Sequence, residues 1–313
     1  MEIDFEPVIM GNMSDHDRVV INQWPKENDP KEHRIVKAIK DQLLSTAGAG
    51  DIFRQTAVIQ LEYFKVSLQR LGESQFIHNY TQKVLEKLAE LTNSKIVAGR
   101  EHLDILYKGG PVLLLTNHLG VYKLNSWPIG ELKEKTGLTG PVQPVFYPFP
   151  LYFSAMYPIA EALNNNLYIA SFEYPGLLGK MFRATGSIEV PPKDDLSQGE
   201  NRTEVLIDST RRLIKANSNA VIVSFPEGGT TGKRNGGGPY DLESFHTGSY
   251  VIAASLGLPI LPVAQYFNPN DGFELRIFEP LRLKTNSNRN ELKQFAKRHC
   301  QEELKWLKEK LTK

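Results

Sequence analysis

Residues 111–123 read PVLLLTNHLGVYK, and this stretch decides how the chain folds. A short apolar run bounded by Gly109 and Gly110 is typical of a buried strand. The strand ends in the pair Asn117 and His118. In open α/β sheets, ligands bind at the carboxyl ends of the strands. A lone histidine is more often structural, so a functional role for His118 needs support from other segments.

The composition narrows the classes of protein. The 313 residues carry a net charge of +1, so no basic field favours nucleic acid as a partner. Cys300 is the single cysteine, which excludes a disulfide framework and a cysteine-based metal site and favours a reducing compartment. No apolar run approaches about 18 residues, and the acidic N-terminus is unlike a signal peptide. We expect a protein of the cytoplasm or a plastid-like soluble compartment, or one bound peripherally to a membrane.

From about residue 95 onward, short apolar runs alternate with stretches of helical spacing. This alternation is typical of a mixed, mostly parallel sheet flanked by helices. The expected strands are residues 96–98, 112–115, 167–170, 188–190, 220–225 and 260–263, and a surface helix is expected over about 290–313. The fold class is therefore α/β.

The region before residue 95 has a different pattern. The tetrapeptide DPKE, residues 29–32, supplies an N-cap, a proline at the first helical position and a capping-box glutamate. Apolar residues then repeat at helical spacing over 35–43, 57–71 and 77–91. We expect a small helical domain, residues 1–95, followed by an α/β domain, residues 96–313. Helical spacing by itself predicts a packing scaffold, and a lid or a partner-binding role is the alternative.

The turn after the most apolar strand reads FPEGG, residues 225–229, and is followed by a glycine-rich segment with Lys233 and Arg234. Such a turn can direct backbone N–H groups and cations toward an anion. It is not a P-loop, because only three residues separate Gly228 from Gly232 and Lys233 is followed by Arg234. The turn therefore predicts an anion-binding segment without nucleotide hydrolysis.

Four segments, taken in order over residues 96–283, resemble the glycerolipid acyltransferase superfamily, which includes lysophosphatidate and glycerol-3-phosphate acyltransferases. They are IVAGRE and NH (96–101 and 117–118), PGLLG and GSIEV (175–179 and 186–190), FPEG (225–228), and FHTG with GLPILPV (245–248 and 257–263). The helical N-terminal region makes the layout similar to that of the soluble plastid-type glycerol-3-phosphate acyltransferases. The resemblance implies the corresponding α/β fold and an acyl-transfer activity.

The resemblance also implies roles for individual residues. His118 would be the general base that takes a proton from the acceptor hydroxyl as it attacks an acyl thioester. The family has an aspartate five positions after this histidine, where this chain has Lys123. We expect another carboxylate to replace it, with Glu227 as the first candidate and Glu131 or Asp241 as alternatives. An amine acceptor, which needs less help from a base, is the other possibility.

Acceptor binding is expected around the same motifs. The arginines that read acceptor phosphate in the family are replaced by Pro192 and Thr230, and nearby cations are expected to take over this role, with solvated surface charges as the alternative. Backbone N–H groups near Gly228 or Gly229 are expected to stabilise the oxyanion. The expected substrate-binding residues are Asn117, Lys193, Phe225, Pro226, Gly228, Gly229, Lys233 and Arg234.

A dense aromatic segment, VFYPFPLYF, occupies residues 145–153. It predicts an acyl channel or a membrane-resting wall, and core packing is the alternative. The channel residues would be Phe146, Tyr147, Phe149, Tyr152 and Phe153. The prolines among them favour an irregular wall over a regular helix.

These observations lead to one functional expectation. An acyltransferase would move a fatty acyl group from acyl-CoA or acyl carrier protein to a hydroxyl or amine of a small molecule or lysolipid, with His118 as base. We expect no cofactor and no metal, because attack on a thioester needs only a base and electrostatic help. The alternative is a catalytically silent relative that binds acyl chains, a membrane or a partner protein, and Lys123 favours it.

Overall fold

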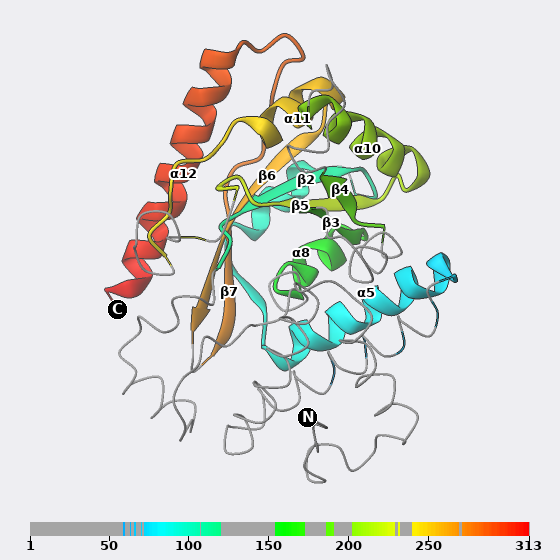
Figure 1. The fold of residues 1–313 in the computed structure, drawn as a ribbon. Helices are drawn as coiled ribbons and strands as arrows, with labels where there is room; N and C mark the ends of the chain where they lie inside the picture. Colours follow the sequence, from blue (N-terminus) through cyan, green and yellow to red (C-terminus); the bar gives the residue numbers. More distant parts are fainter. Residues whose placement is uncertain are drawn as a thin grey trace, which may run out of the picture.

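The structure, a computed structural model, describes residues 59, 63, 66, 70, 72–106, 108–119, 154–172, 186–190, 202–228, 231, 240–268 and 271–312. Within these residues, the chain forms an eight-stranded mixed sheet with helices on both of its faces (Figure 1). The predicted α/β class is confirmed.

The elements follow one another in an order that alternates strands with helices. They are α5 (Ser74–Leu91), β1 (Lys95–Ala98), the 3₁₀ helix η2 (Arg100–Ile105), β2 (Val112–Thr116), α8 (Tyr157–Ala162), β3 (Asn166–Phe172), β4 (Ile188–Val190), α10 (Arg202–Ala216), β5 (Ala220–Ser224), α11 (Gly248–Leu256), β6 (Pro259–Asn268), β7 (Gly272–Ile277), β8 (Leu281–Arg282) and α12 (Arg289–Leu311).

The sheet has the strand order β1-β7-β6-β2-β5-β3-β4, and β8 pairs with β6. The five strands from β6 to β4 run parallel, whereas β7 and β8 are antiparallel to β6. Strand β2 lies between β5 and β6, with β3 beyond β5, so the chain leaves β2 toward one side and returns to its other side through β6. Such a switch in strand order marks the usual position of a ligand site at the carboxyl edge.

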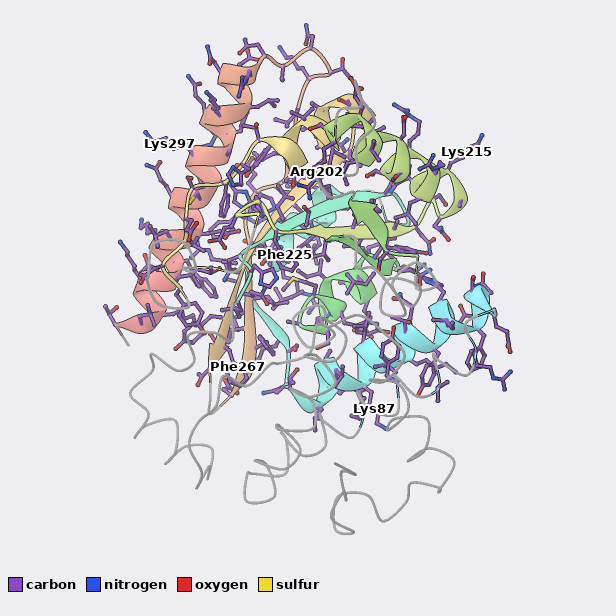
Figure 2. All side chains as sticks on the ribbon, in the orientation of Figure 1. Lys87, Arg202, Lys215, Phe225, Phe267 and Lys297 are labelled. Atoms are coloured by element: carbon purple, nitrogen blue, oxygen red, sulfur yellow. The ribbon has the colours of Figure 1, made fainter. Side chains whose placement is uncertain are left out.

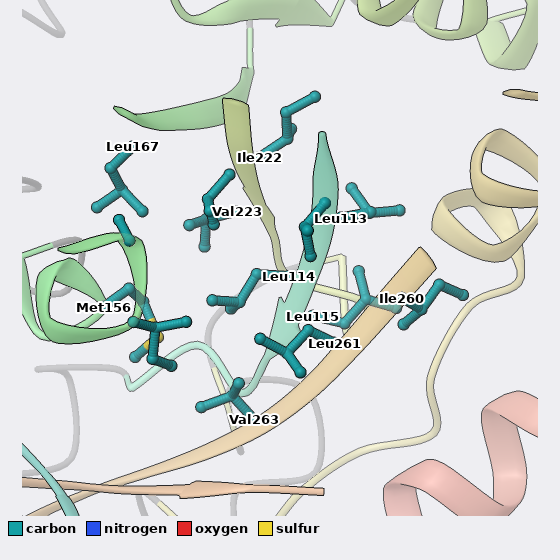
Figure 3. Packing of buried hydrophobic residues seen from close by; sticks show 14 of the residues in the cluster. Leu113, Leu114, Leu115, Met156, Leu167, Ile222, Val223, Ile260, Leu261 and Val263 are labelled. Carbon is teal, nitrogen blue, oxygen red and sulfur yellow. The ribbon is translucent and has the colours of Figure 1, made fainter. Parts of the chain in front are cut away.

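Strand β2 is buried along its whole length, with Leu114 and Leu115 at 0 % exposure. Its leucines pack beside side chains of β5 and β6, among them Val223 and Leu261 (Figure 3). Helices α10, α11 and α12 lie on one side of the sheet, and α5 with α8 lies on the other (Figure 1). A parallel strand covered on both faces has no solvent side, which explains the continuous apolar run in its sequence.

Helix α5, the third helix expected in the N-terminal domain, is bonded directly to the sheet. The Gln82 amide donates to the Leu167 carbonyl at 2.9 Å and accepts from the Leu167 N–H at 3.0 Å. Beside it, the His78 and Tyr168 rings stack at 5.0 Å. Residues 59, 63 and 66 are also helical, while the first expected helix lies outside the described residues. The domain boundary at residue 95 stays a prediction.

Five expected strands match β1 to β5 within two residues at either end, but the C-terminal part of the sheet differs from expectation. Strand β6 continues to Asn268, and β7 and β8 were not expected. The apolar run of β6 ends at Ala264, yet the strand continues because β7 returns antiparallel along it from Gly272. Pairing partners rather than apolar residues extend this strand.

Helix α12 contributes polar side chains to the interior as well as apolar ones. It begins with a capping box formed by Asn288 and Glu291. Farther along the helix, His299 and Glu303 are 2 % and 0 % exposed. His299 lies within hydrogen-bonding distance of Tyr250 on α11. Burial lowers the pKa of His299 to about 3 and raises the pKa of Glu303, whose pKa is raised further by Glu227. The two groups are therefore held as a neutral pair.

We predict that Glu303→Gln becomes more stable relative to the wild type as pH rises above about 4.5. In the unfolded chain Glu303 has the ordinary glutamate pKa of 4.5, so the folded protein keeps the Glu303 proton after the unfolded chain has lost it. The wild-type free energy of unfolding should then fall by about 1.4 kcal/mol per pH unit relative to the variant, until Glu303 itself ionises. Urea unfolding at several pH values measures this difference. Glu302→Gln, at an exposed neighbouring position, is the matched control.

Gly99 ends β1 at a close approach between two parts of the sheet. Its φ is +79°, and a Cβ there would lie 1.8 Å from the Ile277 carbonyl oxygen. Gly109 has a similar φ of +77°, but no described atom would lie within 4 Å of its Cβ. A side chain at Gly99 would meet both backbone strain and steric overlap, whereas a side chain at Gly109 would meet backbone strain alone.

We predict that Gly99→Ala lowers the free energy of unfolding by about 3 kcal/mol or more, because both strain and overlap act. Gly109→Ala should lower it by about 1–2 kcal/mol, since only the left-handed backbone opposes a Cβ. Equilibrium urea denaturation measures both values. Equal losses at the two positions would contradict the close approach at Gly99.

Candidate functional site

His118 lies at the carboxyl end of β2, as expected, and its side chain is half-buried. Its ring packs at a tilt of 54° against Phe225, which follows β5, with 4.3 Å between the ring centres. Phe225 lies near the centre of the described structure (Figure 2). Strands β2 and β5 are parallel neighbours, so their carboxyl ends bring the NH and FPEG motifs together. One imidazole is thus presented at the sheet edge.

Asn117 is 0 % exposed and is bonded to Gln265 of β6. Its amide donates to the Gln265 carbonyl at 3.1 Å and accepts from the Gln265 N–H at 2.8 Å. The Gln265 side chain in turn donates to the Asn117 carbonyl at 2.6 Å. Asn117 therefore belongs to the scaffold that fixes the chain before His118, and its expected contact with substrate stays a prediction.

Glu227 is 1 % exposed, and its carboxylate joins three segments of the chain. One oxygen accepts from the His118 N–H at 3.2 Å and from the Thr231 hydroxyl at 2.6 Å. The other accepts from the Glu243 N–H at 3.0 Å. Glu227 therefore holds the main chain of His118, and its expected role in orienting the imidazole ring stays a prediction.

Burial raises the pKa of Glu227, and its three hydrogen-bond donors oppose this rise. All three donors point hydrogen atoms at the carboxylate, which suits the ionised form because that form only accepts. The dipoles of two backbone N–H groups and one hydroxyl thus compensate the negative charge of this carboxylate.

The turn that carries Glu227 is fixed through its own main chain. The Gly228 N–H donates to the Phe225 carbonyl at 3.1 Å, and Gly228 has a φ of +66°. The Thr231 N–H donates to the His118 carbonyl at 2.8 Å, and the His246 N–H donates to the Pro226 carbonyl at 2.7 Å. The Gly228 N–H therefore closes the turn, and the expected oxyanion donors near Gly228 or Gly229 stay a prediction.

The other expected site residues lie outside the described residues. They are Lys193, Gly229, Lys233, Arg234, Lys123, and the channel residues Phe146, Tyr147, Phe149, Tyr152 and Phe153. Their roles stay predictions. Pro226 is buried within the turn, and its expected contact with substrate also stays a prediction.

Three residues of the site were not expected from the sequence: Thr231, Glu243 and Gln265. Thr231 and Glu243 meet Glu227 from 4 and 16 positions along the chain, and Gln265 lies 148 positions from Asn117. Glu243 contributes its backbone N–H, for which no residue type is a signal. Gln265 alone could have been noticed, as a polar residue within a strongly apolar run.

Two general properties bear on the type of site. Among the described residues, no group of three histidine, cysteine or acidic side chains is placed to hold a metal ion. The helices of the described ranges include none with the length and apolar character needed to cross a bilayer.

Together these features define an α/β protein that presents a histidine at the carboxyl edge of a mostly parallel sheet, held through a buried carboxylate. Residues 161–266 match the family model described as Acyltransferase. The expected resemblance to an acyltransferase family is therefore confirmed over these residues. The match includes Glu227, begins after His118 and covers less than half of the chain.

Among solved structures, the 1-acyl-sn-glycerophosphate (LPA) acyltransferase PlsC from Thermotoga maritima aligns with this chain at 16 % identity and a TM-score of 0.45. The alignment covers 81 % of this chain and 96 % of that one. No curated protein sequence matches the chain significantly.

We predict that Glu227→Gln weakens one of the three bonds of this carboxylate more than the others. The amide oxygen can still accept from the His118 N–H and the Thr231 hydroxyl, but the amide nitrogen then faces the Glu243 N–H, donor against donor. The free energy of unfolding should fall by about 1–3 kcal/mol. Hydrogen exchange should accelerate at the Glu243 amide more than at the His118 amide.

Glu86→Gln, on the exposed side of α5, is the matched control and should leave both amides unchanged. Equal exchange at the Glu243 and His118 amides in Glu227→Gln would contradict the assignment of the two oxygens.

Proposed function

We propose that this protein transfers a fatty acyl group from an acyl-CoA or acyl carrier protein thioester to a hydroxyl or amine acceptor, with His118 as general base. The observation that carries the proposal is the position of His118 at the carboxyl end of β2, beside the FPEG turn and half-buried. The acyltransferase match over residues 161–266 gives the class of reaction.

The geometry suits a base that must be held in place. The His118 N–H is bound by Glu227 and its carbonyl by the Thr231 N–H, so the peptide groups on both sides of its Cα are fixed. The Phe225 ring covers part of the imidazole. The imidazole is half-buried and its neighbouring peptide groups are hydrogen-bonded, and general base catalysis needs a base that is held in place.

The proposed reaction balances without a cofactor. His118 takes the proton of the acceptor hydroxyl as its oxygen attacks the thioester carbonyl carbon, and a tetrahedral oxyanion forms. The carbon–sulfur bond then breaks, and the leaving thiolate takes the proton back from the imidazolium. An amine acceptor follows the same course with its nitrogen as nucleophile. The glycerolipid acyltransferase superfamily, which four sequence segments resemble, acts on glycerolipid-type acceptors, and we propose the same class of acceptor here.

The second candidate is a protein that binds an acyl chain, a membrane surface or a partner without turnover. The observation that favours it is Lys123, because a cation at this position cannot accept the ring N–H of a histidine or stabilise an imidazolium. The two candidates differ in whether His118 supports a chemical step.

We predict acceptor-dependent release of free thiol from acyl-CoA or acyl carrier protein, measured with a thiol reagent over a panel of alcohols and amines. His118→Ala should lower the rate by at least about 10²-fold, the usual contribution of a general base. The released thiol should exceed one equivalent per chain. Cys300 is the single cysteine, so the protein itself can add at most one equivalent of thiol to the signal.

His102→Ala is the matched control. His102 lies in η2, which follows the edge strand β1, whereas the site lies at β2 and β5 in the middle of the sheet. Its rate should equal that of the wild type. If no thioester and acceptor pair gives release above one equivalent, the transferase proposal fails and the binding protein becomes the better reading. A rate lost equally in both variants would also contradict a specific role for His118.

A further inference from the structure

The backbone N–H that binds the second oxygen of Glu227 belongs to a segment, residues 243–246, that lies between the site and α12. On the site side, Glu243 donates to Glu227 at 3.0 Å and His246 to Pro226 at 2.7 Å. On the other side, the Cys300 thiol donates to the Glu243 carbonyl at 3.2 Å. Helix α12 therefore reaches Glu227 through a single intervening segment.

A second contact joins the same segment to α12. The Phe245 ring meets the His299 ring edge-on, with ring centres 5.0 Å apart and an interplanar angle of 78°. Both Phe245 and His299 are buried, so the orientation of the imidazole decides the surface on which Phe245 packs. Whatever fixes His299 therefore also fixes the 243–246 segment.

His299 is fixed at both ring nitrogens. Its Nδ1 is 2.6 Å from the Tyr250 hydroxyl, and its Nε2 is 2.8 Å from a carboxyl oxygen of Glu303. With a neutral imidazole and a neutral Glu303, the protons can run either way along these bonds. Either the Tyr250 O–H donates to Nδ1 and the Nε2–H to Glu303, or the Glu303 O–H donates to Nε2 and the Nδ1–H to Tyr250. All three side chains are at most 2 % exposed, and in both cases they keep the same positions because any unmade bond leaves a desolvated polar group.

Charge also links the hydrogen-bonded group of Tyr250, His299 and Glu303 to the site. Glu227 and Glu303 are both buried, and Glu227 raises the pKa of Glu303 through its negative charge. Glu227 accepts three donors, as an ionised carboxylate does, whereas one of the Glu303 oxygens has no hydrogen-bond partner among the described residues. Two negative charges on these carboxyl groups would repel each other, so a neutral Glu303 lets Glu227 keep its charge.

We propose that Tyr250, His299 and Glu303 are positioning residues for His118. They hold the 243–246 segment, and this segment together with Glu227 holds the main chain of His118. The effect on catalysis rests on the function proposed above, whereas the effect on the geometry of His118 does not. No residue of this group touches the reacting atoms in this account.

The test compares four full-length variants with the wild type by ¹⁵N-edited NMR of the backbone amides. Glu303→Leu removes the acceptor for the His299 ring, and Tyr250→Phe removes only the hydroxyl at Nδ1, so it is the milder variant if Glu303→Leu folds poorly. Glu303→Gln is the conservative variant, because its amide oxygen accepts as the neutral acid does. Leu292→Ala, two turns earlier on α12 and 4 % exposed, loosens the same helix without touching the chain of polar groups.

We predict that the His118 and Glu243 amide signals shift in Glu303→Leu and in Tyr250→Phe, and keep their wild-type positions in Glu303→Gln and Leu292→Ala. In the thiol-release assay, Glu303→Leu should lower kcat about tenfold while KM for the thioester stays within twofold. Leu292→Ala should lower the melting temperature with kcat unchanged.

Three outcomes would overturn the proposal: unchanged His118 and Glu243 signals in both Tyr250→Phe and Glu303→Leu, a shift in Leu292→Ala as large as theirs, or a shift in Glu303→Gln as large as in Glu303→Leu. If the wild type releases no thiol, the transferase proposal fails by itself. The amide signals still decide whether this group positions His118.

Discussion

The Glu227 carboxylate is the interaction on which the site depends. A buried carboxylate is stable only where donors replace the water it has lost. Here the donors belong to residues 118, 231 and 243. Two of them are backbone N–H groups, which cannot be moved without moving the chain. Compensating one charge therefore fixes the relative positions of His118, Thr231 and Glu243, and a polar requirement of the interior becomes the geometry of the site.

Strand β2 supplies the rigid support for this arrangement. Its side chains are buried on both faces, and the apolar contacts end where Asn117 begins the polar site. At this boundary a strand end would normally fray, but Gln265 continues the link to β6 through main-chain and side-chain bonds. Functional groups placed on rigid elements keep their geometry better than groups on loops, and His118 sits one residue beyond such an element.

Much of the fold follows from pattern alone, whereas the roles of single polar residues do not. Strands β2 to β5 are readable because an apolar run has one stable place, the interior, whatever its partners. The motifs place Asn117, Pro226 and Gly228 at the carboxyl edge of the sheet, but their bonds could not be read from the motifs. The partner of Asn117 is Gln265, 148 positions away, and the Gly228 N–H closes the turn onto the Phe225 carbonyl.

The sequence by itself determined the α/β class, the buried strand that ends in His118, and the motifs shared with acyltransferases, because hydrophobic period and local turn chemistry act over neighbouring residues. It also determined that Lys123 stands where the resembling family has an aspartate. Only the tertiary structure decided that Glu227 holds the backbone of His118, and that His299 and Glu303 of the C-terminal helix lie behind it. These bonds join residues up to 109 positions apart, and burial decides which of them must form.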